Sequence, residues 1–127
     1  MRPNSTRPVF LNLLQIRFPP TALASIMHRL AGVLLVLSLP FLIYLLGLSL
    51  QNQQSYTTAI KIIQNPLVSI YLYSLLWAIS HHFAAGIRYF LVDLDIFISK
   101  TSARVSAYVV IVIGILIPVL VFIGRLL

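Results

Sequence analysis

Cysteine and glutamate are absent from the 127 residues, and Asp93 and Asp95 are the only acids. Without cysteine the chain can form neither a disulfide nor a thiolate-bound iron–sulfur cluster, and it cannot carry haem attached through thioethers. Charged residues make up 9% of the chain and apolar residues 60%, against about 25% and about 45–50% in an average soluble domain. The composition therefore indicates a membrane protein.

The charge that remains is strongly positive, because nine lysine and arginine residues against two acids give a formal net charge of +7. In a soluble protein this balance would suggest nucleic-acid binding. Here the basic residues flank apolar runs, as in ordinary membrane topology. No basic helix or aromatic–basic sheet pattern accompanies them, so we expect no nucleic-acid partner.

Three apolar runs are each long enough to cross the hydrocarbon core of a bilayer, which is about 30 Å thick. We predict membrane spans at about residues 28–50, 67–92 and 105–127. Pro40 and Pro118 fall inside the first and third spans, where a membrane helix tolerates a kink. The sequence thus predicts an all-α membrane protein with a three-helix domain at 21–127, preceded by an inner-face segment at 1–20.

The distribution of basic residues predicts the orientation of these helices. Four arginines precede the apolar run that begins at Leu30, whereas Lys61 is the only basic residue in the polar loop that follows it. The N-terminus is therefore expected on the cytoplasmic or matrix side. The first apolar run begins only at Leu30, too late for a secretory signal. The absence of a targeting segment suits a bacterial inner membrane, or a mitochondrial one if the subunit is organelle-encoded.

The most informative residue is His82, because a histidine at membrane depth is costly and usually marks a site. Its neighbours one turn away along the helix are small: Ala78, Ala85 and Gly86. They either leave room beside the imidazole for a flat ligand or simply let two helices approach closely, with His82 hydrogen-bonded across the interface. His81 lies about 100° round the helix, so it is not expected to reach the same ligand.

A second polar cluster lies where the first span begins. Ser25 precedes His28 by three residues and Arg29 by four. This spacing places the three residues on one helical face at the inner edge of the membrane. Thr21, after two prolines, is a candidate N-cap for this helix. The plainer interpretation is an ordinary first turn whose arginine reaches lipid headgroups. Residue spacing alone leaves both interpretations open.

Taken together, these motifs resemble the cytochrome b subunit of succinate dehydrogenase. The resemblance covers nearly the whole chain and its three spans. It rests on Arg7-Pro8, on Ser25-x-x-His28-Arg29, and on His82-x-x-x-Gly86-Ile87-Arg88 followed by Asp93. It implies one of two small membrane anchors of succinate:quinone oxidoreductase, which pack into a helical bundle beneath a flavoprotein subunit and an iron–sulfur subunit.

In that family the histidine at the position of His82 is an axial ligand of haem b, and the second ligand comes from the partner membrane subunit. The resemblance also implies that Ser25 and Arg29 bind ubiquinone and that His28 and Arg29 lie near the haem propionates. The chain would then pass electrons from the iron–sulfur subunit to ubiquinone, in the tricarboxylic acid cycle and the respiratory chain. It would hold no complete active site by itself.

Three positions depart from the family's usual residues: Ala31, Tyr89 and Asp95. They leave the fine structure of the quinone pocket open. The main alternative function is a structural membrane anchor without a direct quinone role. A proton conductor using the histidines is a weaker alternative, because no buried carboxylate would accompany them. The sequence does not distinguish succinate oxidation from fumarate reduction.

Overall fold

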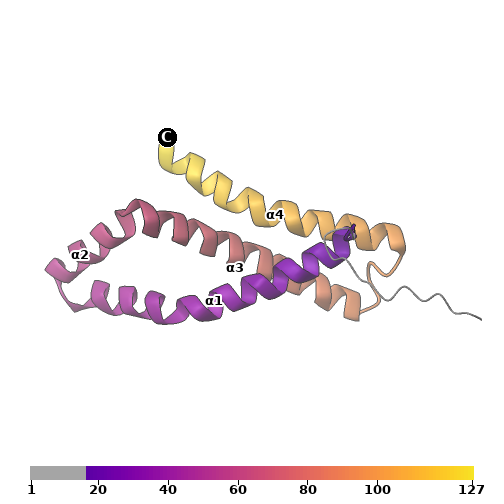
Figure 1. Cartoon of the computed structure of the whole chain (residues 1–127), viewed down its shortest axis with the longest axis horizontal. Helices are drawn as coiled ribbons and strands as arrows, with labels where there is room; N and C mark the ends of the chain where they lie inside the picture. Colours follow the sequence, from indigo (N-terminus) through magenta and orange to yellow (C-terminus); the bar gives the residue numbers. More distant parts are fainter. Residues whose placement is uncertain (1–16) are drawn as a thin grey trace, which may run out of the picture.

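The computed structural model describes residues 17–127, which form helices joined by short turns (Figure 1). The elements are α1 (Pro20–Gln51), α2 (Gln53–Gln64), α3 (Pro66–Asp93) and α4 (Lys100–Leu126). By length and composition α1, α3 and α4 can each cross a membrane. The predicted all-α membrane fold with three spans is thus confirmed. Arg7-Pro8 and most of the predicted segment 1–20 lie outside the described residues.

Helix α3 is the central element, and it packs against both α1 and α4. It runs antiparallel to each of them: Phe41 of α1 meets Tyr71 edge-on at 5.6 Å between ring centroids, while the other end of α1 lies beside His81 and His82. On the other flank, Tyr73 meets Phe122 of α4 at 5.7 Å. These contacts fix which face of α3 each neighbour covers.

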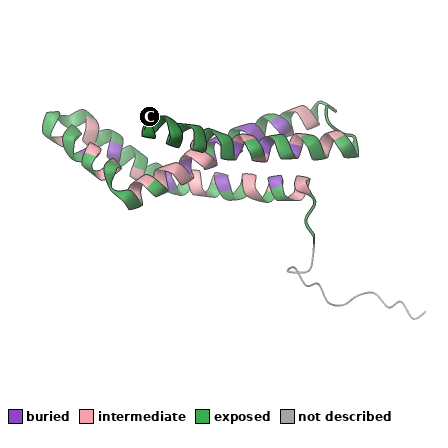
Figure 2. Cartoon of the chain, turned by 90° about the horizontal axis from the view of Figure 1, so that it is seen from above, coloured by how far each residue is buried: buried purple, intermediate pink, exposed green. Residues whose placement is uncertain are grey.

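The interior of the bundle is built from small side chains. The buried residues where helices meet include Ala24, Ala31, Ala78, Ala85 and Ala107, each at most 1% exposed. Large aliphatic and aromatic residues are mostly exposed, and Figure 2 shows the buried residues as short separate bands along the helices. Small interfacial residues let membrane helices approach closely, while lipid solvates the large ones.

Helix α1 has its N-cap two residues before the predicted one. Pro20 occupies its first turn, and the N-cap is Pro19, which offers no side-chain hydrogen bond, so the prediction of Thr21 as N-cap is wrong. Proline suits a first turn because the amide hydrogen it lacks would have no helical partner there. The helix continues through Pro40, and α4 continues through Pro118.

The polar loop after the first span contains a helix that the sequence analysis did not predict. The side chain of Asn52 accepts a hydrogen bond from the Ser55 amide at 2.9 Å and caps α2. Ala59 is the buried residue of this helix, and Tyr56 and Ile63 lie one turn to either side of it. That spacing was the available signal for a helix, but the polar residues before it suggested a loop.

The turn between α3 and α4 closes with a left-handed residue. The Ile96 amide donates to the Leu91 carbonyl at 2.9 Å, and the Asp95 amide donates to the Val92 carbonyl at 3.0 Å. This pair of bonds is the Schellman helix ending, whose C′ residue takes a positive φ. Asp95 has φ 60° and Phe97 has φ 66°. The family's usual small residue at position 95 therefore corresponds to a backbone conformation that favours glycine.

Candidate functional site

His82 is half-buried on α3 and faces α1. Its Nδ1 lies 3.1 Å from the backbone carbonyl of His28. Because a carbonyl can only accept, Nδ1 is the protonated nitrogen of this ring. The other nitrogen, Nε2, has no hydrogen-bond partner within residues 17–127 and is not enclosed. An imidazole whose Nδ1–H is held by a carbonyl while Nε2 stays open is the arrangement typical of metal-ligating histidines.

Two shallow grooves meet at this imidazole. One has a volume of about 470 Å³ and is lined by α1 residues together with His82: His28, Arg29, Gly32, Val33, Val36 and Leu37. The other, of about 360 Å³, runs along α3 past Gly86, with Phe83, Ile87 and Phe90 as its other walls. Apart from His28, Arg29 and His82 these surfaces are apolar. They suit a flat, largely apolar group beside the ring.

The plane of the His82 ring is fixed by its neighbours on α1. The His28 ring stacks on it with centroids 4.1 Å apart and an angle of 20° between planes. A Cβ atom built on Gly32 would lie only 3.0 Å from His82 Cε1, so the backbone of α1 touches the edge of the imidazole there. Gly32 is a site residue that the sequence analysis missed, because its contact crosses between helices.

The small residues near His82 serve two different purposes. Ala78 and Ala85 are buried between helices, which matches the close-packing interpretation of these residues. Gly86 is exposed, lines the groove beside His82, and has nothing within 4 Å of a Cβ built on it. Of the three, only Gly86 leaves open space next to the imidazole.

His81 points away from this site into the junction of three helices. It is fully buried, its Nε2 lies 3.4 Å from the Ala24 carbonyl, and its ring stacks on Trp77 at 5.7 Å. A Cβ built on Gly114 of α4 would lie 2.9 Å from His81 Cβ. The two adjacent histidines therefore differ completely: His81 is packed among α1, α3 and α4, and His82 borders open grooves.

The first polar cluster is only partly joined to His82. His28 and Arg29 line the same groove as His82, and the Arg29 side chain is exposed. Ser25 is half-buried one turn earlier on α1 and is not among the residues that line this groove. The ring centroid of His28 also lies 5.3 Å from that of Tyr89. The buried Tyr89 hydroxyl has no hydrogen-bond partner within the described chain.

Arg88 follows His82 on α3 but faces α4 instead of α1. The side chain is 7% exposed and turns toward α4, where Nε donates to Ser106 Oγ at 3.0 Å and Nη2 donates to the Ala103 carbonyl at 3.3 Å. Its guanidinium carbon also lies 5.4 Å from the centre of the Tyr89 ring. Six residues along the helix, about 9 Å of rise, separate it from His82.

Two comparisons with known proteins agree with each other. Residues 3–122 match the family described as succinate dehydrogenase/fumarate reductase transmembrane subunit. The succinate dehydrogenase cytochrome b556 subunit of Coxiella burnetii (strain RSA 493 / Nine Mile phase I) is 36% identical over 112 residues, which cover 87% of this chain and 90% of that protein. The family match covers α1 and α3 completely, His82 included, and α4 as far as residue 122.

Proposed function

Since this chain belongs to the family of succinate dehydrogenase/fumarate reductase transmembrane subunits, we propose that it binds haem b through His82 and ubiquinone beside Ser25 and Arg29. It is a multi-pass inner-membrane subunit of an oxidoreductase complex. Its proposed part in that complex is to carry electrons from the iron–sulfur subunit to ubiquinone.

The observation that carries the haem proposal is the hydrogen bond between His82 Nδ1 and the His28 carbonyl at 3.1 Å. This bond holds the proton on Nδ1 and leaves the lone pair of Nε2 available to iron. A carbonyl in this position also fixes the ring plane and makes the ligating nitrogen more basic. The residues present therefore fit a haem, whose near-planar macrocycle would lie against the apolar grooves that border His82.

The remaining histidines do not supply a second open ligand of the same kind. His81 is enclosed between three helices, and the His28 ring lies flat against His82. If haem were held by two histidines, the second would then have to come from another membrane subunit. We accordingly propose that haem is held between this chain and such a partner, with His28 and Arg29 near the propionates. Bound haem b supplies a one-electron carrier whose potential depends on its axial ligands and surroundings.

The quinone proposal rests on Arg29, an exposed cation at the mouth of the groove that also contains His82. A guanidinium there stabilises negative charge that develops on a quinone oxygen as electrons arrive. The Ser25 hydroxyl, one turn away, can donate a hydrogen bond to such an oxygen. With this end of the bundle on the predicted inner side, protons reach the site from the inner aqueous phase.

Replacing Arg29 with leucine tests the quinone role in the assembled complex. We expect succinate:ubiquinone reductase activity to fall at least about tenfold, since a positioned charge is lost. Succinate oxidation by a soluble artificial acceptor should be unchanged, because the flavoprotein and iron–sulfur subunits remain intact. Lys61→Leu, at an exposed position on α2, is the matched control and should retain both activities.

Full quinone turnover in the Arg29→Leu complex would refute this quinone role. A purified complex that lacks haem yet turns over quinone at the normal rate would instead favour the alternative function, a structural anchor without a direct quinone role. Measuring haem content and both activities on the same preparations separates these outcomes.

A further inference from the structure

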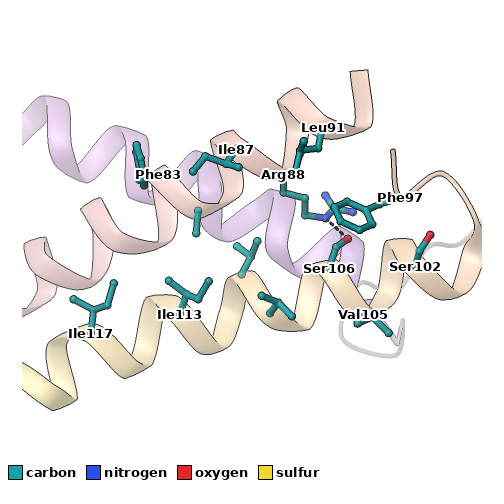
Figure 3. A pocket seen from close by; sticks show the side chains of 13 residues that line it. Phe83, Ile87, Arg88, Leu91, Phe97, Ser102, Val105, Ser106, Ile113 and Ile117 are labelled. Carbon is teal, nitrogen blue, oxygen red and sulfur yellow. Dashed lines mark hydrogen bonds between the residues drawn. The ribbon is translucent and has the colours of Figure 1, made fainter. Parts of the chain in front are cut away.

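Among residues 17–127, Arg88 is the one charged side chain that is buried. It is held between α3 and α4 by three contacts. Nε donates to Ser106 Oγ at 3.0 Å, as Figure 3 shows, and Nη2 donates to the Ala103 carbonyl at 3.3 Å. The guanidinium carbon lies over the Tyr89 ring, 5.4 Å from its centre, where the face of the ring attracts a cation. All three partners are neutral, so they hold the charge in place without cancelling it.

The acids of the sequence do not neutralise this charge. They are Asp93 and Asp95, both of which are exposed, and within residues 17–127 neither forms an ion pair with Arg88. Water and salt screen a buried charge much less than a charge at the surface. The field of the guanidinium therefore acts on other groups inside the bundle.

A row of aromatic rings connects Arg88 to the site at His82. Tyr89 follows His82 by seven residues, so the two side chains lie two turns apart on one face of α3. The ring of His28 lies between them, with centroid distances of 5.3 Å to Tyr89 and 4.1 Å to His82. Together with the 5.4 Å from Arg88 to the Tyr89 ring, these distances place the guanidinium carbon at most about 15 Å from the centre of the His82 ring.

We propose that the buried charge of Arg88 raises the reduction potential of the haem that His82 is proposed to ligate. Reduction adds negative charge to the haem, and a nearby cation favours the reduced form. At about 15 Å and an effective dielectric constant of about 20, one unit charge changes such an equilibrium by about sixfold. The inference rests on the proposed function and adds to it a residue that adjusts the potential without touching haem or quinone.

The same contacts would also allow a purely mechanical role. Arg88 packs on Tyr89, and Tyr89 packs on the His28 ring. That ring in turn packs on His82. A mechanical role depends on the shape and the hydrogen bonds of the side chains, whereas the field depends on the net charge. The two roles can be separated at Ser106, which contacts Arg88 and borders an open groove between α3 and α4, so that a longer side chain has room there.

The test is a redox titration of the haem in the purified complex, followed by visible absorbance. Ser106→Asp places a carboxylate beside the guanidinium, which keeps that carboxylate ionised. We expect the midpoint potential to fall by about 45 mV, which is a sixfold change at about 59 mV per tenfold. Ser106→Asn, with a side chain of the same shape and no charge, should keep the wild-type potential.

Two further variants change a cation directly. Arg88→Gln removes the buried charge and should lower the potential by about the same amount as Ser106→Asp. Arg104→Gln removes an exposed charge from α4 and should have a much smaller effect, because solvent screens that charge. An unchanged potential in Arg88→Gln would overturn the proposal independently of the Ser106 variants.

Equal midpoint potentials in Ser106→Asp and Ser106→Asn would also overturn the proposal. If both equal the wild type, the charge does not act on the haem; if both are lowered, the role of Arg88 is mechanical. Failure of the proposed function gives a different result, because His82→Ala would then keep the wild-type visible spectrum whatever the potentials of the other variants.

Discussion

At the scale of single residues, two adjacent histidines differ in the α1 backbone carbonyl that each one faces. The Ala24 carbonyl faces Nε2 of His81, and the His28 carbonyl faces Nδ1 of His82. The first ring is thereby fixed inside the protein, whereas Nε2 of the second has no hydrogen-bond partner within residues 17–127. The sequence alone indicated that the two side chains diverge by about 100°. It could not indicate which carbonyl each ring would meet, because those contacts join residues more than fifty positions apart.

The close approach of Gly32 to His82 gives a prediction at the same scale. A Cβ at this position would lie 3.0 Å from His82 Cε1 and 3.4 Å from Nδ1, so Gly32→Ala should push the imidazole and strain its bond to the His28 carbonyl. We expect haem retention in the purified complex to weaken by about tenfold or more, as for other losses of support behind a ligating histidine. The haem-to-protein ratio after washing measures this effect.

Gly47→Ala is the matched control, because Gly47 lies on the same helix and has nothing within 4 Å of an added Cβ. Its haem-to-protein ratio should equal that of the wild type. If Gly32→Ala retained haem as well as Gly47→Ala does, the ring would not be held by the backbone of α1.

At the scale of elements, the junction around His81 joins the three long helices. Gly114→Ala would place a Cβ 2.9 Å from His81 Cβ and 3.1 Å from its Nδ1, and neither helix can shift without disturbing α1. Overpacking of this kind costs about 1–3 kcal/mol. We therefore expect a lower thermal midpoint for the detergent-solubilised complex. Gly124→Ala, on the same helix with open space around it, should leave the midpoint unchanged. Equal midpoints for the two variants would refute the close packing of Gly114 against His81.

The turn between α3 and α4 yields a second prediction at this scale. Asp95 has φ 60° at the C′ position of the helix ending, a conformation that aspartate tolerates and β-branched residues resist. Asp95→Val should destabilise the complex by about 1–3 kcal/mol, whereas Asp95→Gly should match or exceed the wild type. Thermal midpoints of the two variants provide the measurement. A valine variant as stable as the glycine variant would contradict the left-handed assignment.

The elements differed in how far the sequence could predict them. The long spans were predictable because uncharged apolar runs of this length have few other structures available. Helix α2 was missed because its polar first turn resembles a loop and because its apolar residues recur with helical spacing over only a short stretch. The burial of Arg88 was missed for another reason: its partners Ser106 and Ala103 lie on α4, and no local pattern reports which neighbour a side chain will face.

At the scale of the whole molecule, the site is open on one side. The helices are held together through small residues, and most of the large apolar side chains face outward. The grooves at His82 are shallow and open toward the surroundings of the chain. On the proposed function, a single subunit would offer one ligand to the haem iron and would cover the haem on one side only. This arrangement explains why haem binding should require the assembled complex rather than this chain alone.

The most direct test of the account is the dithionite-reduced minus oxidised visible spectrum of the purified complex, for wild type and for His82→Ala. We predict a b-type haem signal in the wild type that is lost, or changed to another ligation state, in His82→Ala. Ile70→Ala, at an exposed position on the same helix and about 18 Å along it, should keep the wild-type spectrum. An unaltered spectrum in His82→Ala would contradict the central claim that His82 is the haem ligand.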